Sequence, residues 1–204
     1  MEERMIEQII SVKFVTVTVT FFLLMDGLGN IPIFVSLLKN LSPKRQVFII
    51  ARESLIALVA MLFFALCGDF VLKHLGIKNQ TIQIAGGIIL FMIAIKMIFS
   101  NSNHDIELEK DEPFIVPLAI PLVAGPSVLA TIMIYSKDPL IQTIVIPSVV
   151  VAWLFTTVIL LLSTPIKSFL GEKGIVAVEK LMGLILTLIA VQLFLDGLYT
   201  FLHT

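Results

Sequence analysis

Six apolar stretches, each long enough to cross a lipid bilayer, take up most of this chain. The hydrocarbon core of a bilayer is about 30 Å thick, which a helix of about 20 apolar residues crosses. The stretches are 14–38, 48–72, 81–99, 114–135, 140–162 and 176–201. With 58% hydrophobic residues, 14% charged residues and a mean hydropathy of +1.04, the chain has too much apolar surface for a soluble domain. We predict an all-α integral membrane protein with a single transmembrane domain over residues 1–204.

The connections between these stretches are short, and the longest, residues 100–112, is acidic. They leave no room for a catalytic, nucleotide-binding or DNA-binding domain. No Ser/His/Asp arrangement or intramembrane protease spacing is present, and the three histidines lack metal-ligand spacing. The single Cys67 excludes an intrachain disulfide. We therefore expect no enzyme activity, no cofactor, no metal and no nucleic acid partner.

Basic residues predict the orientation, because cytoplasmic loops carry an excess of Lys and Arg. Of the 14 Lys and Arg residues, five lie on the same side of the membrane as the N-terminus: Arg4, Lys13, Lys73, Lys78 and Lys137. The other nine lie on the opposite side. We expect a multi-pass protein of the cell (inner) membrane with both termini outside and a retained first helix. The sequence leaves the oligomeric state open.

The first apolar stretch is interrupted near its middle by the string DGLGNIP, from Asp26 to Pro32. A carboxylate at the centre of a membrane helix costs about 2.5 to 3.5 kcal/mol, and glycine and proline weaken the helix there. The fourth stretch has a similar interruption, PLVAGPS, from Pro121 to Ser127. We predict that helices 1 and 4 are broken at mid-membrane. Paired broken helices in two halves of a chain indicate a transporter binding site.

Two glycine pairs support an internal repeat. Gly29 aligns with Gly125 at an offset of 96 residues, and Gly87 aligns with Gly183 at the same offset. Three helices per repeat place the second copy upside down in the membrane. We predict two inverted-topology repeats, about 10–99 and 113–204, joined by the acidic cytoplasmic loop 100–112.

The breaks predict a site for a zwitterion. With Asn30 and Gly125 as N-caps, Pro32 and Pro126 fall in the first helical turns, where a missing N–H costs nothing. The two helix N-termini then favour an anion such as a carboxylate. The carboxylate of Asp26 and the carbonyls that end the preceding half-helices favour a cation or an ammonium group. A neutral amino acid carries both charges.

The strings DGLGNIPIF and PLVAGPS, together with the size and the six spans, closely resemble those of the MarC family, also called SnatA-type neutral amino acid transporters. The resemblance implies ion-coupled transport of small neutral amino acids such as glycine, alanine or serine across the inner membrane. The family usually has a proline directly after the aspartate, where this chain has Gly27. The expected substrate-binding residues are Asp26, Gly27, Gly29, Asn30, Pro32, Gly125, Pro126 and Ser127. Asp26 is also the candidate for coupling H+ or Na+.

Other roles remain open for several of these residues. Asp26 is also suited to tie down the kink by bonding neighbouring backbone N–H groups. Gly86, Gly87 and Gly183 are more typical of helix packing. We expect Arg52 and Glu53 to be interfacial anchors, at a place where the glutamate can pair with a loop lysine, and a gate is the alternative role. An alternative function is efflux of cations or small amphipathic compounds. Cation exporters are expected to have several acids at midplane depth, where the sequence indicates only Asp26.

Overall fold

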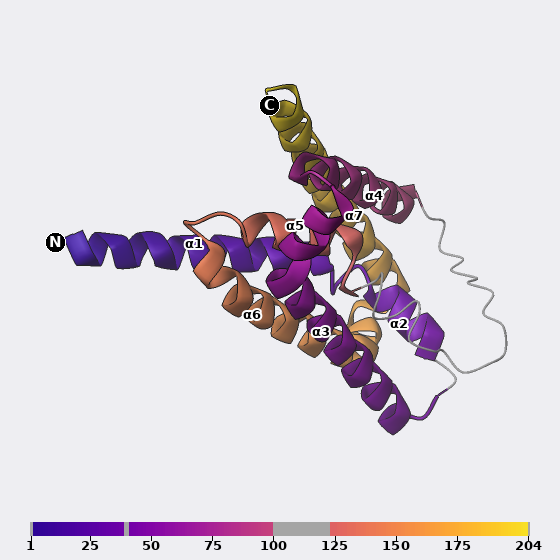
Figure 1. Ribbon diagram of the computed structural model, residues 1–204. Coiled ribbons are helices and arrows are strands. Elements are labelled where there is room, and N and C mark those ends of the chain that lie inside the picture. The colour runs from indigo at the N-terminus through magenta and orange to yellow at the C-terminus, as the bar shows by residue number, and fades with distance from the viewer. Residues whose placement is uncertain (1, 39–40, 100–122, 204) are drawn as a thin grey trace.

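The computed structural model describes residues 2–38, 41–99 and 123–203, and every regular element in them is a helix (Figure 1). The elements are α1 (Glu2–Met25), α2 (Ile31–Leu38), α3 (Pro43–Leu75), α4 (Asn79–Phe99), α5 (Pro126–Tyr135), α6 (Gln142–Leu161) and α7 (Ser163–Leu202). The acidic loop 100–112 and the first part of the fourth apolar stretch lie outside the described residues.

Four of these helices contain segments that are long and apolar enough to cross a membrane. The segments are Pro43–Gly68 in α3, Gln80–Phe99 in α4, Gln142–Leu161 in α6 and Lys173–Leu202 in α7. A shorter apolar segment, Ser11–Met25, belongs to α1. The prediction of an all-helical, multi-pass membrane protein is confirmed at this level.

Local sequence explains where several helices begin and end. Helix α3 has Pro43 in its first turn and ends at Gly76, whose left-handed conformation (φ 66°) lets its N–H reach the carbonyls of Leu72 and Lys73. In α7, Gly171 has φ 68° and ψ 174°, so it divides the helix into two parts. The membrane-crossing part of α7 follows this kink.

The most extensive contact in the described structure is between α4 and α7 (Figure 1). A Cβ added at Gly87 would lie 2.9 Å from the backbone oxygen of Ala190, and one at Gly183 would lie 3.0 Å from the backbone oxygen of Ala94. These two glycines therefore let the helix backbones approach closely, which confirms the packing role expected of them. Gly86 likewise packs against Ala130 of α5.

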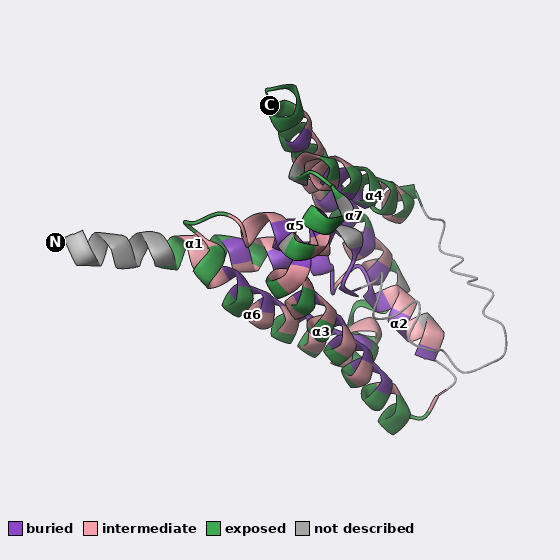
Figure 2. Ribbon diagram, in the orientation of Figure 1, coloured by how far each residue is buried: buried purple, intermediate pink, exposed green. Residues whose placement is uncertain are grey.

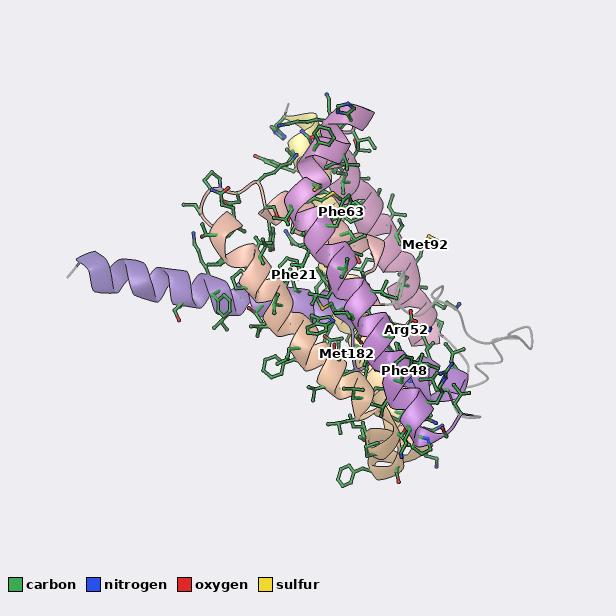
Figure 3. All side chains as sticks on the ribbon, turned by 60° about the horizontal axis from the view of Figure 1, so that its bottom comes forward. Phe21, Phe48, Arg52, Phe63, Met92 and Met182 are labelled. Atoms are coloured by element: carbon green, nitrogen blue, oxygen red, sulfur yellow. The ribbon has the colours of Figure 1, made fainter. Side chains whose placement is uncertain are left out.

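The remaining helices pack around this pair. Helix α6 lies against both α1 and α3, α5 lies between α3 and α4, and α2 contacts α7. Buried residues lie where the helices meet, and exposed ones cover the outward sides (Figure 2). Figure 3 labels both kinds: Phe21 and Met182 are buried, whereas Phe63 and Met92 are exposed. Large exposed apolar side chains on the outside are what a surface in contact with lipid requires.

Candidate functional site

The first apolar stretch is broken where the sequence predicts. Helix α1 ends at Met25, α2 begins at Ile31, and a turn separates them. Asp26 has φ 45°, a left-handed conformation that Asp tolerates better than most residues. The N–H of Asn30 donates to the carbonyl of Asp26 at 3.0 Å, and the N–H of Phe34 donates to that of Asn30 at 3.0 Å. Asn30 thus stands at the predicted N-cap position of α2, with Pro32 in the first turn.

The polar side chains of this turn bond its own backbone. Oδ1 of Asp26 accepts a hydrogen bond from the N–H of Gly29 at 3.1 Å, and Nδ2 of Asn30 donates to the carbonyl of Met25 at 3.2 Å. Both side chains are buried, at 6% and 7% exposure. The structural role considered for Asp26 is therefore present. Asn30 closes the C-terminus of α1 with its side chain, rather than only starting α2.

Two glycines allow neighbouring helices to close around the turn. A Cβ at Gly29 would overlap Oδ2 of Asp26 and Cε of Met97, which belongs to α4. A Cβ at Gly27 would lie 3.1 Å from Cγ2 and 3.4 Å from Cα of Thr156 in α6. The carboxylate of Asp26 therefore folds back over Gly29, and side chains of α4 and α6 pack against the turn.

A second acid lies close to this turn. Glu179 of α7 is 6% exposed and lies within electrostatic reach of Asp26. Our sequence analysis missed it because it lies near the start of the sixth apolar stretch, beside Lys180, where an acid is expected to reach water. Its position inside the sixth apolar stretch, three residues after residue 176, was the one sequence signal that could have indicated a buried acid. The charge of a second buried carboxylate, that of Glu179, therefore acts on Asp26.

The described part of the second break carries no charged side chain. Gly125 has φ −67° and ψ 160° and is the N-cap of α5, which begins at Pro126, as predicted. Its carbonyl accepts a hydrogen bond from the N–H of Leu129 at 3.0 Å, and the cap has no side-chain hydrogen bond. Val123, Ala124 and Gly125 are buried, as is Ser127. Pro121 and the side chain of Pro126 lie outside the described residues.

Helix α4 contacts both breaks. Met97 reaches Gly29, while a Cβ at Gly86 would lie 3.7 Å from Cα of Ser127. These two positions of α4 are about three turns, or about 16 Å, apart along the helix. The eight predicted site residues thus form two groups, one at each break, with α4 as a wall common to both.

A third feature is a groove of about 270 Å³ on the outer side of the crossing between α4 and α7. Its lining is apolar and includes Phe91, Met92 and Phe194. It contains none of the predicted site residues, and its surface suits an apolar chain rather than a charged amino acid.

The pair Arg52 and Glu53 differs from the prediction. Glu53 is 1% exposed. Its Oε1 accepts a hydrogen bond from Nε of Arg52 at 2.8 Å and forms an ion pair with Nη2 at 2.7 Å, and the Arg52 side chain is 38% exposed. Glu53 is not paired with a loop lysine in the described structure. Its charged partner is the neighbouring Arg52. The side chain of Glu53 is therefore buried in the protein, whereas that of Arg52, labelled in Figure 3, is partly exposed.

Comparison with known proteins gives the family. The sequence profile of the MarC family integral membrane proteins matches residues 11–202. The chain is 50% identical over 189 residues to the UPF0056 inner membrane protein YhgN of Escherichia coli (strain K12), covering 91% of this chain and 96% of that protein. It is 48% identical over 188 residues to a UPF0056 membrane protein of Buchnera aphidicola (subsp. Schizaphis graminum), with 91% and 96% covered.

A UPF0056 membrane protein of Chlamydia trachomatis (serovar D) is 38% identical over 186 residues, covering 90% of this chain and 91% of that protein. No solved structure matches the chain. The profile and the relatives cover nearly the whole chain, including both breaks. The protein belongs to the MarC family of integral membrane proteins.

Proposed function

We propose that this protein is a secondary transporter of small neutral amino acids, such as glycine, alanine and serine, coupled to H+ or Na+. The observation that carries the proposal is the turn between α1 and α2. There, the buried residue Asp26 directly follows the end of α1, and α2 begins five residues later.

The charges at this turn suit the two ends of an amino acid. The carboxylates of Asp26 and Glu179 attract an ammonium group, as do the carbonyls at the C-terminus of α1. The N-termini of α2 and α5 attract a carboxylate through their backbone N–H groups. A side chain larger than that of serine would have to fit against Met97 and Thr156, so we expect small substrates.

Alternating access is proposed to occur between two inverted repeats. Gly87 packs on Ala190 while Gly183 packs on Ala94, and the offset of 96 exchanges the two contacts. The same offset relates α2 to α5 and α4 to α7. The contact between α2 and α7 therefore corresponds to the contact between α5 and α4. Rocking of one repeat against the other about the α4–α7 pair would open the breaks to each side in turn. Both termini are proposed to face outward.

Transport by purified protein in liposomes tests this proposal. Vesicles containing the protein should take up labelled glycine, alanine or serine above the level of empty vesicles, and Asp26→Asn should sharply reduce that uptake. Asp196→Asn, which neutralises an exposed acid on α7, serves as the matched control. Uptake equal to that of empty vesicles for every small amino acid would contradict the proposal.

Efflux of cations or small amphipathic compounds is the second candidate. The sequence indicated a single buried acid, Asp26, and the structure adds the buried Glu179. This second acid supports the efflux candidate, because cation carriers use several buried acids. A deletion strain with an unchanged sensitivity to cations and amphipathic drugs would dismiss this candidate.

A further inference from the structure

The side chain of Met97 in α4 ends beside a carboxylate oxygen at the first break. A Cβ added at Gly29 would lie closer than 3.0 Å to both Oδ2 of Asp26 and Cε of Met97, so these two atoms are neighbours over the glycine. Oδ1 of Asp26 accepts the hydrogen bond from the N–H of Gly29, which leaves Oδ2 outside the turn's own hydrogen bonds. An ammonium group that binds Oδ2 therefore shares its space with the Met97 methyl group.

The two ends of the Met97 side chain are held differently. Its Cβ lies 3.0 Å from the place of a Cβ added at Gly183, so the close crossing of α4 and α7 fixes where the side chain starts. Its Cε ends an unbranched, flexible thioether chain that adapts its shape readily. The methyl end of Met97 can therefore turn aside for a small group next to Oδ2, while the stem stays at the break.

The contact that α6 makes with the turn has less freedom. A Cβ at Gly27 would lie 3.4 Å from Cα and 3.5 Å from the carbonyl oxygen of Thr156, which are backbone atoms. The Thr156 hydroxyl donates to Sδ of Met25 at 3.8 Å, and a β-branched side chain is stiff about its first bond. Of these two neighbours of the turn, Met97 is the one whose side chain can adjust the space at Asp26.

The second break has an apolar side chain in the corresponding position. The offset of 96 residues takes Met97 to Leu193 of α7. A Cβ added at Gly86 would lie 3.5 Å from Cδ2 of Leu193 and 3.7 Å from Cα of Ser127, so Leu193 lies near the start of α5. Each proposed repeat thus brings a large apolar side chain from its third helix to its own break, and the one at the first break meets a carboxylate.

The place of the Met97 methyl group limits what fits next to Asp26. When the ammonium group of an amino acid binds Oδ2, its α carbon follows directly, so a substituent on that carbon meets the Met97 side chain. Glycine has no such substituent, and those of alanine and serine are short. A longer side chain needs more space than a turn of the methyl end releases, because the stem of Met97 is packed against α7.

We propose that Met97 sets the upper size limit of the amino acids that this protein carries. This inference rests on the proposed transport function and names a residue that determines the substrate range of the same site. Met97 is not among the eight predicted site residues, because in the sequence it is one more apolar residue of a membrane-crossing segment.

Uptake of labelled alanine and leucine into liposomes, measured side by side, tests this role. Met97→Ala removes Cγ, Sδ and Cε, as many heavy atoms as leucine has beyond alanine. The ratio of leucine uptake to alanine uptake should therefore rise at least about tenfold, the low end of the discrimination that one methylene group gives in an apolar pocket. Met97→Leu, which nearly keeps the volume, should leave the ratio close to that of wild type.

Met92→Ala is the matched control, because it removes the same atoms from an exposed methionine of the same helix (Figure 3). It should leave the ratio unchanged. A merely structural role of Met97 would lower the uptake of both amino acids together in Met97→Ala without changing their ratio, and that result would overturn the proposal. If Met97→Ala does not elute as a folded protein, Met97→Val takes its place, and an unchanged ratio in it counts equally against Met97.

The wild-type protein distinguishes failure of this role from failure of the proposed function. If wild type takes up alanine and Met97→Ala keeps the wild-type ratio, the size limit lies elsewhere and the transporter stands. Wild type that carries leucine as readily as alanine would also refute the size limit alone. If wild type takes up no small amino acid above the level of empty vesicles, the transport function is wrong and the size limit falls with it.

Discussion

The two breaks differ in how the backbone groups at the helix interruption are capped. At the first, between α1 and α2, the side chains of Asp26 and Asn30 bond the backbone groups that the missing helical turn leaves over. At the second, Gly125 and Pro126 start α5 with backbone conformation alone, and the cap has no side-chain hydrogen bond. The first break thus has a charged side chain bonded to its own backbone, whereas the described part of the second is uncharged and has backbone donors at the start of α5.

This difference suggests a division of labour in the proposed transporter. The first break, with Asp26 and the nearby Glu179, supplies negative charge for an ammonium group or a cation. The second supplies the N–H groups of α5 for a carboxylate. Because α4 contacts the two breaks about three turns apart, a small amino acid would meet both only after the helices move.

The largest expected effect separates the charge of Asp26 from its hydrogen bond. Asp26→Asn keeps an oxygen that can accept from the N–H of Gly29, so the protein should remain folded while amino acid uptake falls by at least about 30-fold. Asp26→Ala should lose the uptake and also about 1–3 kcal/mol of stability, because the N–H of Gly29 is left unbonded. Uptake assays and thermal unfolding in detergent measure both. Equal stability of the two variants would show that the bond does not hold the turn.

Ligand binding is expected to stabilise the protein by about 2.7 kcal/mol at a concentration about 100 times the dissociation constant. A thermal-unfolding series over glycine, alanine, serine and larger amino acids should show this only for the small ones. Asp26→Asn should abolish the shift, and Ser127→Ala at the second break should reduce it. A shift that survives in Asp26→Asn would move the site away from the first break.

Adding a methyl group at the first break should destabilise the protein by about 1–3 kcal/mol, the usual cost of overpacking. The effect should be larger for Gly29→Ala, whose Cβ would overlap Asp26 and Met97, than for Gly27→Ala, whose Cβ meets Thr156 at 3.1 Å. Thermal unfolding of the two variants in the same detergent ranks them. The reverse order would mean that the turn yields more easily than α6 does.

The smallest effect compares side-chain bonds near the two breaks. Asn30→Ala removes the donor to the carbonyl of Met25 and should cost about 1–2 kcal/mol, because that carbonyl is then buried without this partner. Thr131→Val removes the hydroxyl that bonds the carbonyl of Ser127 at 2.9 Å and should cost less than about 1 kcal/mol, since the helix already uses that carbonyl. Similar costs in thermal unfolding would remove the contrast between the breaks.

Much of the fold and part of the candidate site follow from local sequence. The turn at Asp26, the N-cap at Gly125 and the first-turn prolines depend on backbone preferences of Asp, Gly and Pro, which act within a few residues. The bond between Asp26 and Gly29 is equally local. The approach of Glu179 to Asp26 joins residues far apart in the chain, so no local pattern contains it.

The sequence by itself determined that this protein is a bundle of membrane helices with an interruption in the first, because a bilayer requires every backbone group to be bonded within the protein. Only the tertiary structure decided which sides of the helices face inward. In a membrane helix the sides toward lipid and toward protein are both apolar, so the pattern of apolar residues does not distinguish them. That is why Glu53 is buried although the sequence predicted an interfacial anchor, while Phe63 and Met92 face outward.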